Sequence, residues 1–190
     1  LYNDRLDISK SFNSNFLKDF PQKQVRAYTD LYDDAIKLMR SKDLDAFDLT
    51  KESQEMRDAY GDNKFGQGCL LARRLVENSV RFVEVQYGGW DMHNDVFGNL
   101  ETKGATLDQG LSTLLMDLDM RGLLSETMIV VASEFGRSPE VKSGRVGRDH
   151  HPSSFSALLA GGGVKPGYVH GQSDKRGHYV EEKGVGMEDL

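Results

Sequence analysis

The stretch "TMIVVASEFGRSP", residues 127–139, decides the fold. It opens with a continuous apolar run, residues 127–133, and turns polar at Glu134. An apolar run of this length is typical of a strand that is buried on both faces of a parallel sheet. In open α/β sheets, ligands bind beyond the carboxyl ends of the strands. The stretch therefore predicts a buried strand that is followed by residues of a functional site.

Helix and strand patterns alternate around this run. Residues 65–79 have an amphipathic helical pattern, and residues 80–87 are rich in β-branched and aromatic residues, which favours a strand. Residues 96–122 carry a leucine stripe and end at Gly122, which suits a helix C-cap. After a polar loop, residues 154–160 have the pattern of a third strand. This alternation predicts a layered α/β domain with a parallel sheet.

The N-terminal part of the chain has a different texture. Residues 1–60 are polar with helical spacing of apolar residues, and they contain no catalytic motif. We expect them to form a helical segment that packs on the same domain. We expect residues 61–190 to form the α/β core, which contains every candidate site residue.

Composition narrows the class of protein. The 190 residues are 38% hydrophobic and 28% charged, which is typical of a globular domain. A net charge of -6 without a basic patch argues against nucleic-acid binding. No apolar run is long enough to span a bilayer, and the first ten residues lack a signal-peptide pattern. The single cysteine, Cys69, excludes an internal disulfide and a multi-cysteine metal site, and its simplest interpretation is a buried thiol.

Three polar clusters lie at the ends of the predicted strands. They are Asp91 and His93 after the first strand, Glu134 and Arg137 after the second, and Asp149, His150 and His151 before the third. The predicted sheet would bring all three clusters to one edge. Carboxylate and imidazole groups together suit a transition metal such as zinc or manganese. The planar guanidinium of Arg137 suits a sulfate or phosphate oxygen.

Each cluster also has a simpler interpretation. Asp91 and His93 could form a polar turn, Glu134 could pair only with Arg137, and one ring of the His150–His151 pair could simply pack in a loop. The coincidence of ligand types at several strand ends favours a metal site. Two other motifs are excluded, because the glycine-rich stretch at residues 158–167 lacks the Lys-Ser/Thr of a phosphate loop and the chain has no G-x-S-x-G.

Four motifs occur in an order that resembles a known bacterial family, the domain of unknown function 1501 family. They are "GGWDMH" (88–93), "EFGRSP" (134–139), "GRDHHP" (147–152) and "LLAGGGVKPG" (158–167), together with "GQGCLLARRLVENSVRFVEV" (66–85). The resemblance runs from about residue 25 to the end. That family is grouped with the alkaline phosphatase and sulfatase superfamily. The resemblance therefore implies a parallel-sheet α/β fold of that type, here partial, with a helical N-terminal segment.

The resemblance also implies roles for individual residues. The implied metal ligands are Asp91, His93, Glu134 and His150. His150 is preferred to His151, which stays a candidate, because the family's "GRDH" pattern falls on it. Asp149 would be a ligand or would orient an imidazole, and Arg137 or Arg148 would clamp the anion. The implied cofactor is a divalent metal, either zinc, manganese or calcium. Phe135 stands where the superfamily has a second histidine, which argues against a complete two-metal centre.

The function implied by the resemblance is metal-dependent hydrolysis of sulfate or phosphate esters, with a small-molecule or glycan substrate. The chain looks like an excerpt, because the superfamily's nucleophile strand would precede Leu1. Family members often carry an export signal, which implies a periplasmic or surface location. The alternative is a catalytically degenerate, non-enzymatic binding protein of the same fold at the cell envelope, which Phe135 favours. A nucleotide-binding domain is a third hypothesis, and the absent phosphate loop argues against it.

Overall fold

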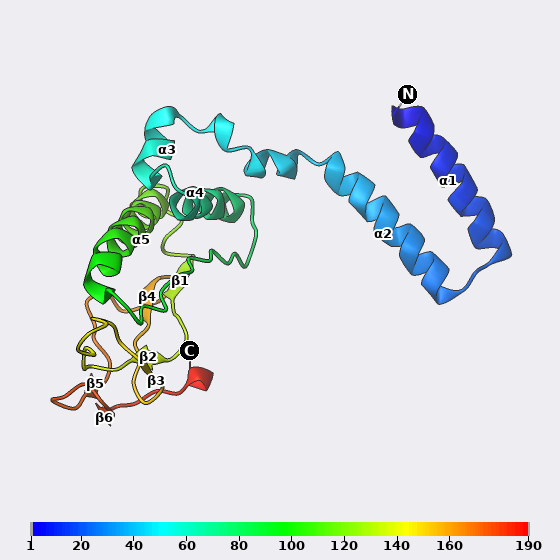
Figure 1. Ribbon diagram of the computed structural model, residues 1–190. Coiled ribbons are helices and arrows are strands. Elements are labelled where there is room, and N and C mark those ends of the chain that lie inside the picture. The colour runs from blue at the N-terminus through cyan, green and yellow to red at the C-terminus, as the bar shows by residue number, and fades with distance from the viewer. Residues whose placement is uncertain (1, 190) are drawn as a thin grey trace. The chain divides into compact units, whose positions relative to one another are not determined.

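The computed structural model describes residues 2–189 (Figure 1). Within these residues, helices account for 49% of the chain, and the strands form only short two-stranded sheets. The chain divides into two compact units, Leu1–Asp48 (unit 1) and Leu49–Leu190 (unit 2), and each is described by itself. The expectation that residues 1–60 pack on the same domain as the rest stays a prediction.

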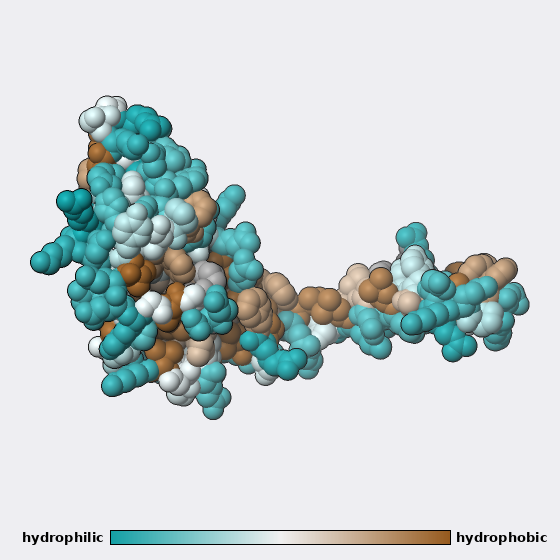
Figure 2. All heavy atoms as spheres, turned by 90° about the horizontal axis from the view of Figure 1, so that it is seen from below, coloured by the Kyte–Doolittle hydropathy of each residue, from teal (hydrophilic) through white to brown (hydrophobic). Residues whose placement is uncertain are grey.

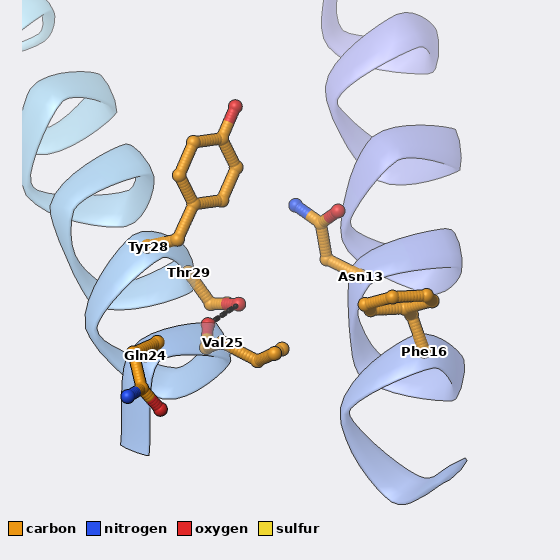
Figure 3. Close-up of a pocket in the computed structure, with 6 residues that line it drawn as sticks. All are labelled: Asn13, Phe16, Gln24, Val25, Tyr28 and Thr29. Carbon is orange, nitrogen blue, oxygen red and sulfur yellow. Dashed lines mark hydrogen bonds between the residues drawn. The ribbon is translucent and has the colours of Figure 1, made fainter. Parts of the chain in front are cut away.

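Unit 1 consists of α1 (Tyr2–Asp19), α2 (Lys23–Met39) and the short 3-10 helix η1 (Lys42–Phe47). Pro21 separates α1 from α2, because the residue before a proline is disfavoured in the helical region. A cavity of about 380 Å³ lies between the two helices, where side chains of α1 face side chains of α2 (Figure 3). Its lining residues are Asn13, Phe16, Gln24, Val25, Tyr28 and Thr29.

Many apolar side chains of unit 1 are exposed. Figure 2 shows hydrophobic residues in brown over these helices. The exposed ones include Phe12, Leu31 and Met39, each more than 60% exposed. Leu6 and Ile36 are buried. The main hydrophobic core of the described chain lies in unit 2.

Unit 2 begins with four helices: η2 (Leu49–Lys51), α3 (Gln54–Tyr60), α4 (Lys64–Glu77) and α5 (Val96–Met120). A side-chain cap begins each α-helix, because the oxygen accepts a hydrogen bond from a free backbone N–H of the first turn. The capping residues are Ser53, Asn63 and Asp95. Gly122, at φ +71°, follows the end of α5. The helices predicted over residues 65–79 and 96–122 are confirmed within a few residues.

The core of unit 2 lies between α3, α4 and α5. Its buried side chains are Tyr60, Phe65, Cys69, Leu70, Leu114 and Leu118. Gly110 of α5 allows the close approach of α4, because a Cβ there would lie 2.9 Å from the ring of Phe65. Burial raises the pKa of Cys69 to about 11, and the thiol is only 2% exposed. The interpretation of Cys69 as a buried thiol is confirmed.

A buried arginine lies beside this core. Arg73 of α4 is 1% exposed and forms ion pairs with Glu52 at 2.8 Å, Glu77 at 2.5 Å and Asp117 at 2.8 Å. Burial alone would lower the pKa of Arg73, but its carboxylate partners outweigh burial and raise it. The hydroxyl of Tyr60 donates to Asp117 at 3.0 Å. Asp117 therefore joins α3, α4 and α5.

Two further arginines neutralise the same carboxylates. Arg74 pairs with Glu52, and Arg121 donates to Asp117 at 2.6 Å. Burial alone would raise the pKa of Glu52, but hydrogen bonds from Arg73 and Arg74 outweigh burial and lower it. Three arginines thus face three carboxylates, so the charges of this network balance. Charge balance of this kind is what allows ionised groups to be buried.

The strands follow the helices in the chain. The pairs are β1 (Met128–Val131) with β4 (Leu158–Gly161), β2 (Gly136–Arg137) with β3 (His150–His151), and β5 (Gln172–Ser173) with β6 (Val180–Glu182). Each pair is antiparallel. The described chain ends with the short 3-10 helix η3 (Met187–Asp189).

The predicted parallel-sheet α/β fold is wrong. The run at residues 127–133 does contain β1, but β1 pairs antiparallel with β4, and its residues alternate between exposed and half-buried. The connection from β1 to β4 contains a loop and the β2–β3 pair and lacks the crossover helix that parallel pairing needs. The strand predicted over residues 80–87 is also wrong, because these residues form no strand, and Phe82 is 81% exposed. Patterning along the chain predicted the position of β1 but not its partner.

Among residues 2–189, no helix combines the length and the apolar character that crossing a bilayer requires.

Candidate metal centre

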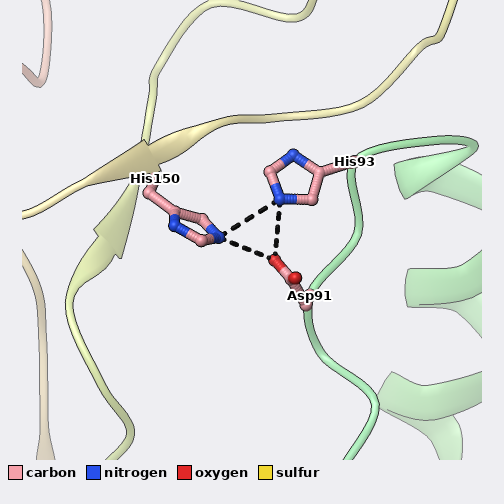
Figure 4. A group of neighbouring side chains, drawn as sticks. All are labelled: Asp91, His93 and His150. Carbon is pink, nitrogen blue, oxygen red and sulfur yellow. Dashed lines mark hydrogen bonds and ion pairs between the residues drawn. The ribbon is translucent and has the colours of Figure 1, made fainter.

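Asp91, His93 and His150 converge in unit 2 (Figure 4). Oδ1 of Asp91 lies 3.0 Å from Nε2 of His93 and 2.9 Å from Nε2 of His150. The two imidazole nitrogens are 3.2 Å apart. Ligands held about 2.0–2.1 Å from one ion lie about 2.9–3.4 Å from each other in octahedral or tetrahedral geometry. The three donor atoms therefore have the spacing of a single-ion site.

Aromatic packing positions the segment that leads to Asp91. Phe65 of α4 stacks on Tyr87 with ring centroids 4.7 Å apart, and Trp90 meets Tyr87 edge-on at 5.4 Å. The ammonium of Lys103, from α5, lies 4.9 Å from the centroid of Tyr87. The segment before the site is thus held against α4 and α5, and Asp91 follows directly after Trp90.

Backbone pairing brings His150 to this segment. The β2–β3 ladder places His150 opposite Arg137, and the N–H of Arg148 donates to the carbonyl of Met92 at 3.1 Å. Met92 is buried, and its burial holds the neighbouring residues Asp91 and His93 in place. These contacts are local pairings of loops and short strands. They bring the ligand types together without a parallel sheet.

His151 does not join the cluster. Neighbouring residues of a strand face opposite sides, so His151 points away from the side chains that His150 meets. Its Nε2 lies 2.5 Å from the carbonyl oxygen of His178, and the ring of His178 contacts Glu140 at 2.6 Å. Strand alternation therefore separates the two histidines that the sequence left as neighbouring candidates.

Arg137 links the cluster to Glu134. Its guanidinium donates to Asp91 at 2.5 Å and to Glu134 at 2.8 Å. Hydrogen bonds from His150 and Arg137 lower the pKa of Asp91 to about 2, so this carboxyl is ionised near neutral pH. Arg137 connects Glu134 to the cluster, but Glu134 is not one of the cluster's three members. The ring of Phe135 packs against His150 with centroids 4.6 Å apart.

The remaining two candidates have supporting contacts. Oδ1 of Asp149 faces Nδ1 of His93 at 3.4 Å, and its Oδ2 pairs with Lys142 at 2.8 Å. The hydrogen bond from Lys142 lowers the pKa of Asp149. Arg148 donates from its side chain to the carbonyl of Ser138 at 3.0 Å. Asp149 therefore contacts a candidate ligand, whereas Arg148 contacts the loop beside it.

Sequence reasoning missed two residues of this site. Lys142 pairs with Asp149, and Gly147 packs so closely on His93 that a Cβ would lie 1.8 Å from its carbonyl oxygen. The signal for both is the stretch "KSGRVGR", residues 142–148, in which glycines alternate with basic residues just before the "DHH" triplet. Close approach of two backbones is a use of glycine that spacing alone does not reveal.

Fold and cluster together define a protein whose regular structure is mainly helical, with a partly exposed Asp–His–His group of metal-ligand type. A comparison with known families matches residues 2–190 to the family described as "Protein of unknown function (DUF1501)". The chain belongs to this family. No curated protein and no solved structure matches the chain. The family resemblance seen in the sequence is thus confirmed, over a longer range than the motifs alone covered.

Proposed function

We propose that this chain provides the metal centre of a hydrolase that cleaves sulfate or phosphate esters. The observation that carries the proposal is the convergence of Asp91, His93 and His150 within ligand spacing. In this assignment the Asp91 carboxylate and the two Nε2 atoms hold one divalent ion. Such an ion withdraws charge from an ester oxygen and so favours attack at sulfur or phosphorus.

The donor set favours zinc or manganese as the ion. Two imidazole nitrogens and one carboxylate oxygen suit transition metals, whereas calcium takes six to eight oxygen ligands. The side chains are open to solvent on one side, with Asp91 59% and His150 47% exposed. An open position beside three protein ligands distinguishes catalytic from structural metal sites.

The charges around the cluster favour an anionic substrate. Arg137 pairs with Asp91 and Glu134, and Lys142 and Arg145 lie against Asp149, so the charges of these six side chains balance before any ion binds, although the whole chain carries -6. A bound divalent ion would then make the group net positive. The planar guanidinium of Arg137, which pairs with carboxylates here, is of the type that holds oxygens of a sulfate or phosphate.

We include in this proposal a distant relation of the chain to the alkaline phosphatase and sulfatase superfamily. Its support is the order of ligand types along the chain, from Asp91 and His93 through Glu134 to His150. The proposal also includes export to the cell envelope and a glycan or small-molecule ester as substrate. The family resemblance is the support for both.

A second candidate function is binding without turnover at the envelope. It is favoured by Phe135, whose ring lies against His150, and by Glu134, whose carboxylate pairs with Arg137. A centre with one ion and no second metal would then serve recognition of an anion.

Metal titration of the purified chain tests the proposal. We expect one zinc or manganese ion per chain by calorimetry, with binding lost in Asp91→Asn. Asp119→Asn makes the same change at an exposed carboxylate of α5 and should leave binding intact. A wild-type chain that binds neither metal would overturn the proposal. Chromogenic sulfate and phosphate esters then separate the two candidates, because metal binding without turnover of either ester favours the non-enzymatic one.

A further inference from the structure

The loop of residues 142–148, which we call the bracing loop, is bonded to the segment that carries His93. Three backbone hydrogen bonds join them: Arg148 N to Met92 O at 3.1 Å, Asp95 N to Arg145 O at 3.0 Å, and Val96 N to Val146 O at 2.8 Å. Gly147 is buried in this contact, and nothing larger than its hydrogen fits against the carbonyl of His93. The bracing loop is therefore held in a fixed position beside His93.

Asp149 follows the bracing loop directly and is fixed from three sides. Its backbone exchanges hydrogen bonds with Ser138, whose N–H donates to its carbonyl at 2.9 Å and whose hydroxyl accepts from its N–H at 3.2 Å. Lys142 holds Oδ2 at 2.8 Å, and Arg145 lies 3.7 Å from Oδ1. Oδ1 faces Nδ1 of His93 at 3.4 Å. The carboxylate thus has one oxygen for the ammonium and one for the imidazole.

We propose that Asp149 is a positioning residue for the metal centre: it accepts the Nδ1–H of His93 and leaves Nε2 free to bind an ion. An ionised carboxylate can only accept hydrogen bonds, so the imidazole must present its N–H at Nδ1. A neutral imidazole has one N–H, so the lone pair is on Nε2, the atom that faces Asp91 and His150. Lys142 holds the carboxylate in this orientation. The inference rests on the proposed metal centre.

The arrangement is specific to His93. The ring of His150 is held by Phe135 and by its place in the β2–β3 ladder, and its polar side-chain contacts among the described residues are made through Nε2. Asp149 therefore controls one of the two imidazoles. Carboxylates that orient a metal-binding histidine typically change metal affinity by 10- to 100-fold when they are removed.

Cobalt(II) titration of the full chain, followed by its visible absorption, tests this role. Asp149→Asn keeps the shape of the side chain but offers an N–H to the imidazole as readily as an oxygen. We expect it to weaken cobalt binding by about 10- to 100-fold and to change the absorption bands, because the coordination of His93 changes. Lys142→Met should act in the same direction with a smaller effect. Glu140→Gln is the matched control, since its carboxylate contacts His178 behind the strand and not the cluster.

The outcomes separate the two proposals. If the wild type binds cobalt and Asp149→Asn binds it equally tightly with the same spectrum, the positioning role is overturned while the metal centre stands. If the wild type binds neither cobalt nor zinc, both proposals fall. If Asp149→Asn fails to fold by circular dichroism, the double variant Asp149→Ala/Lys142→Met decides, because it removes the carboxylate together with the ammonium that pairs with it. Unchanged affinity and spectrum in that variant overturn the role.

Discussion

Replacing Arg73 by methionine tests what holds the helices of unit 2 together. The guanidinium is 1% exposed and pairs with carboxylates of Glu52, Glu77 and Asp117. Removing one member of a buried ion pair costs about 3–5 kcal/mol, because the partner charge stays buried. Each carboxylate keeps a second arginine here, and methionine retains much of the side-chain volume. We therefore expect a loss near the lower limit, about 3 kcal/mol.

Urea unfolding followed by tryptophan fluorescence measures this loss. Trp90 is the single tryptophan of the chain and packs on Tyr87, so its emission reports on unit 2. With a slope of about 2 kcal/mol per molar urea, the midpoint should fall by about 1.5 M. Arg176→Met removes an exposed guanidinium and should leave the midpoint unchanged. A fall of less than about 0.5 M at unchanged slope would show that the network contributes little, contrary to this reasoning.

Three further predictions concern pH, thiol reactivity and glycine. Burial opposes ionisation of Glu52, but hydrogen bonds from arginines outweigh burial and lower its pKa. The ionised Glu52 therefore stabilises the folded chain above about pH 4.3, the ordinary pKa of glutamate, and this stabilisation is lost as pH falls through the lower pKa of the folded state. Urea midpoints measured from pH 7 to pH 3 should drop in that window. Cys69, with its pKa raised to about 11, should react with a thiol reagent at pH 8 only as fast as the protein opens, and immediate reaction would contradict its burial. Gly147→Ala should destabilise the chain by about 1–3 kcal/mol and weaken cobalt binding, because its Cβ meets the carbonyl of His93. Gly104→Ala, at an open position inside α5, should instead stabilise the chain by about 0.5–1 kcal/mol in the same unfolding assay.

The helices of unit 2 could be predicted from sequence because their signals are local. Asn63 and Asp95 cap α4 and α5 through backbone groups three residues away, and Gly122 follows α5 with the positive φ that glycine adopts without strain. Such signals depend only on neighbouring residues. The apolar stripes then decide which face packs, as the buried Leu114 and Leu118 show.

The sheet could not be predicted in the same way. Residues 80–87 and 127–133 have equally good strand composition, but only the second forms a ladder. Strand pairing depends on residues far apart in the chain, and a continuous apolar run does not distinguish a parallel from an antiparallel partner. The connection between β1 and β4 contains no helix. A parallel pair needs a crossover connection, usually a helix, so this connection favours antiparallel pairing.

Part of the candidate site could be predicted from the sequence. Residue types made Asp91, His93 and the His150–His151 pair candidates, and the family resemblance preferred His150. The structure places the donor atoms of Asp91, His93 and His150 together. The pairing of Glu134 with Arg137 was the simpler interpretation of that cluster, and the structure contains this pair. Spacing along the chain could not foresee contacts that depend on loop geometry, such as Lys142 with Asp149 or Gly147 with His93.

The contacts that assemble the cluster support the proposed metal centre without reference to the fold class. A parallel sheet would have justified the site by analogy with other enzymes of that architecture. These contacts do not depend on a parallel sheet. The β2–β3 ladder positions His150, the bracing loop positions His93, and aromatic packing positions the segment before Asp91. Correcting the fold therefore removes the analogy but none of these contacts. The donor atoms lie 2.9–3.2 Å apart, as ligands of one ion do, and a metal titration tests directly whether they bind one.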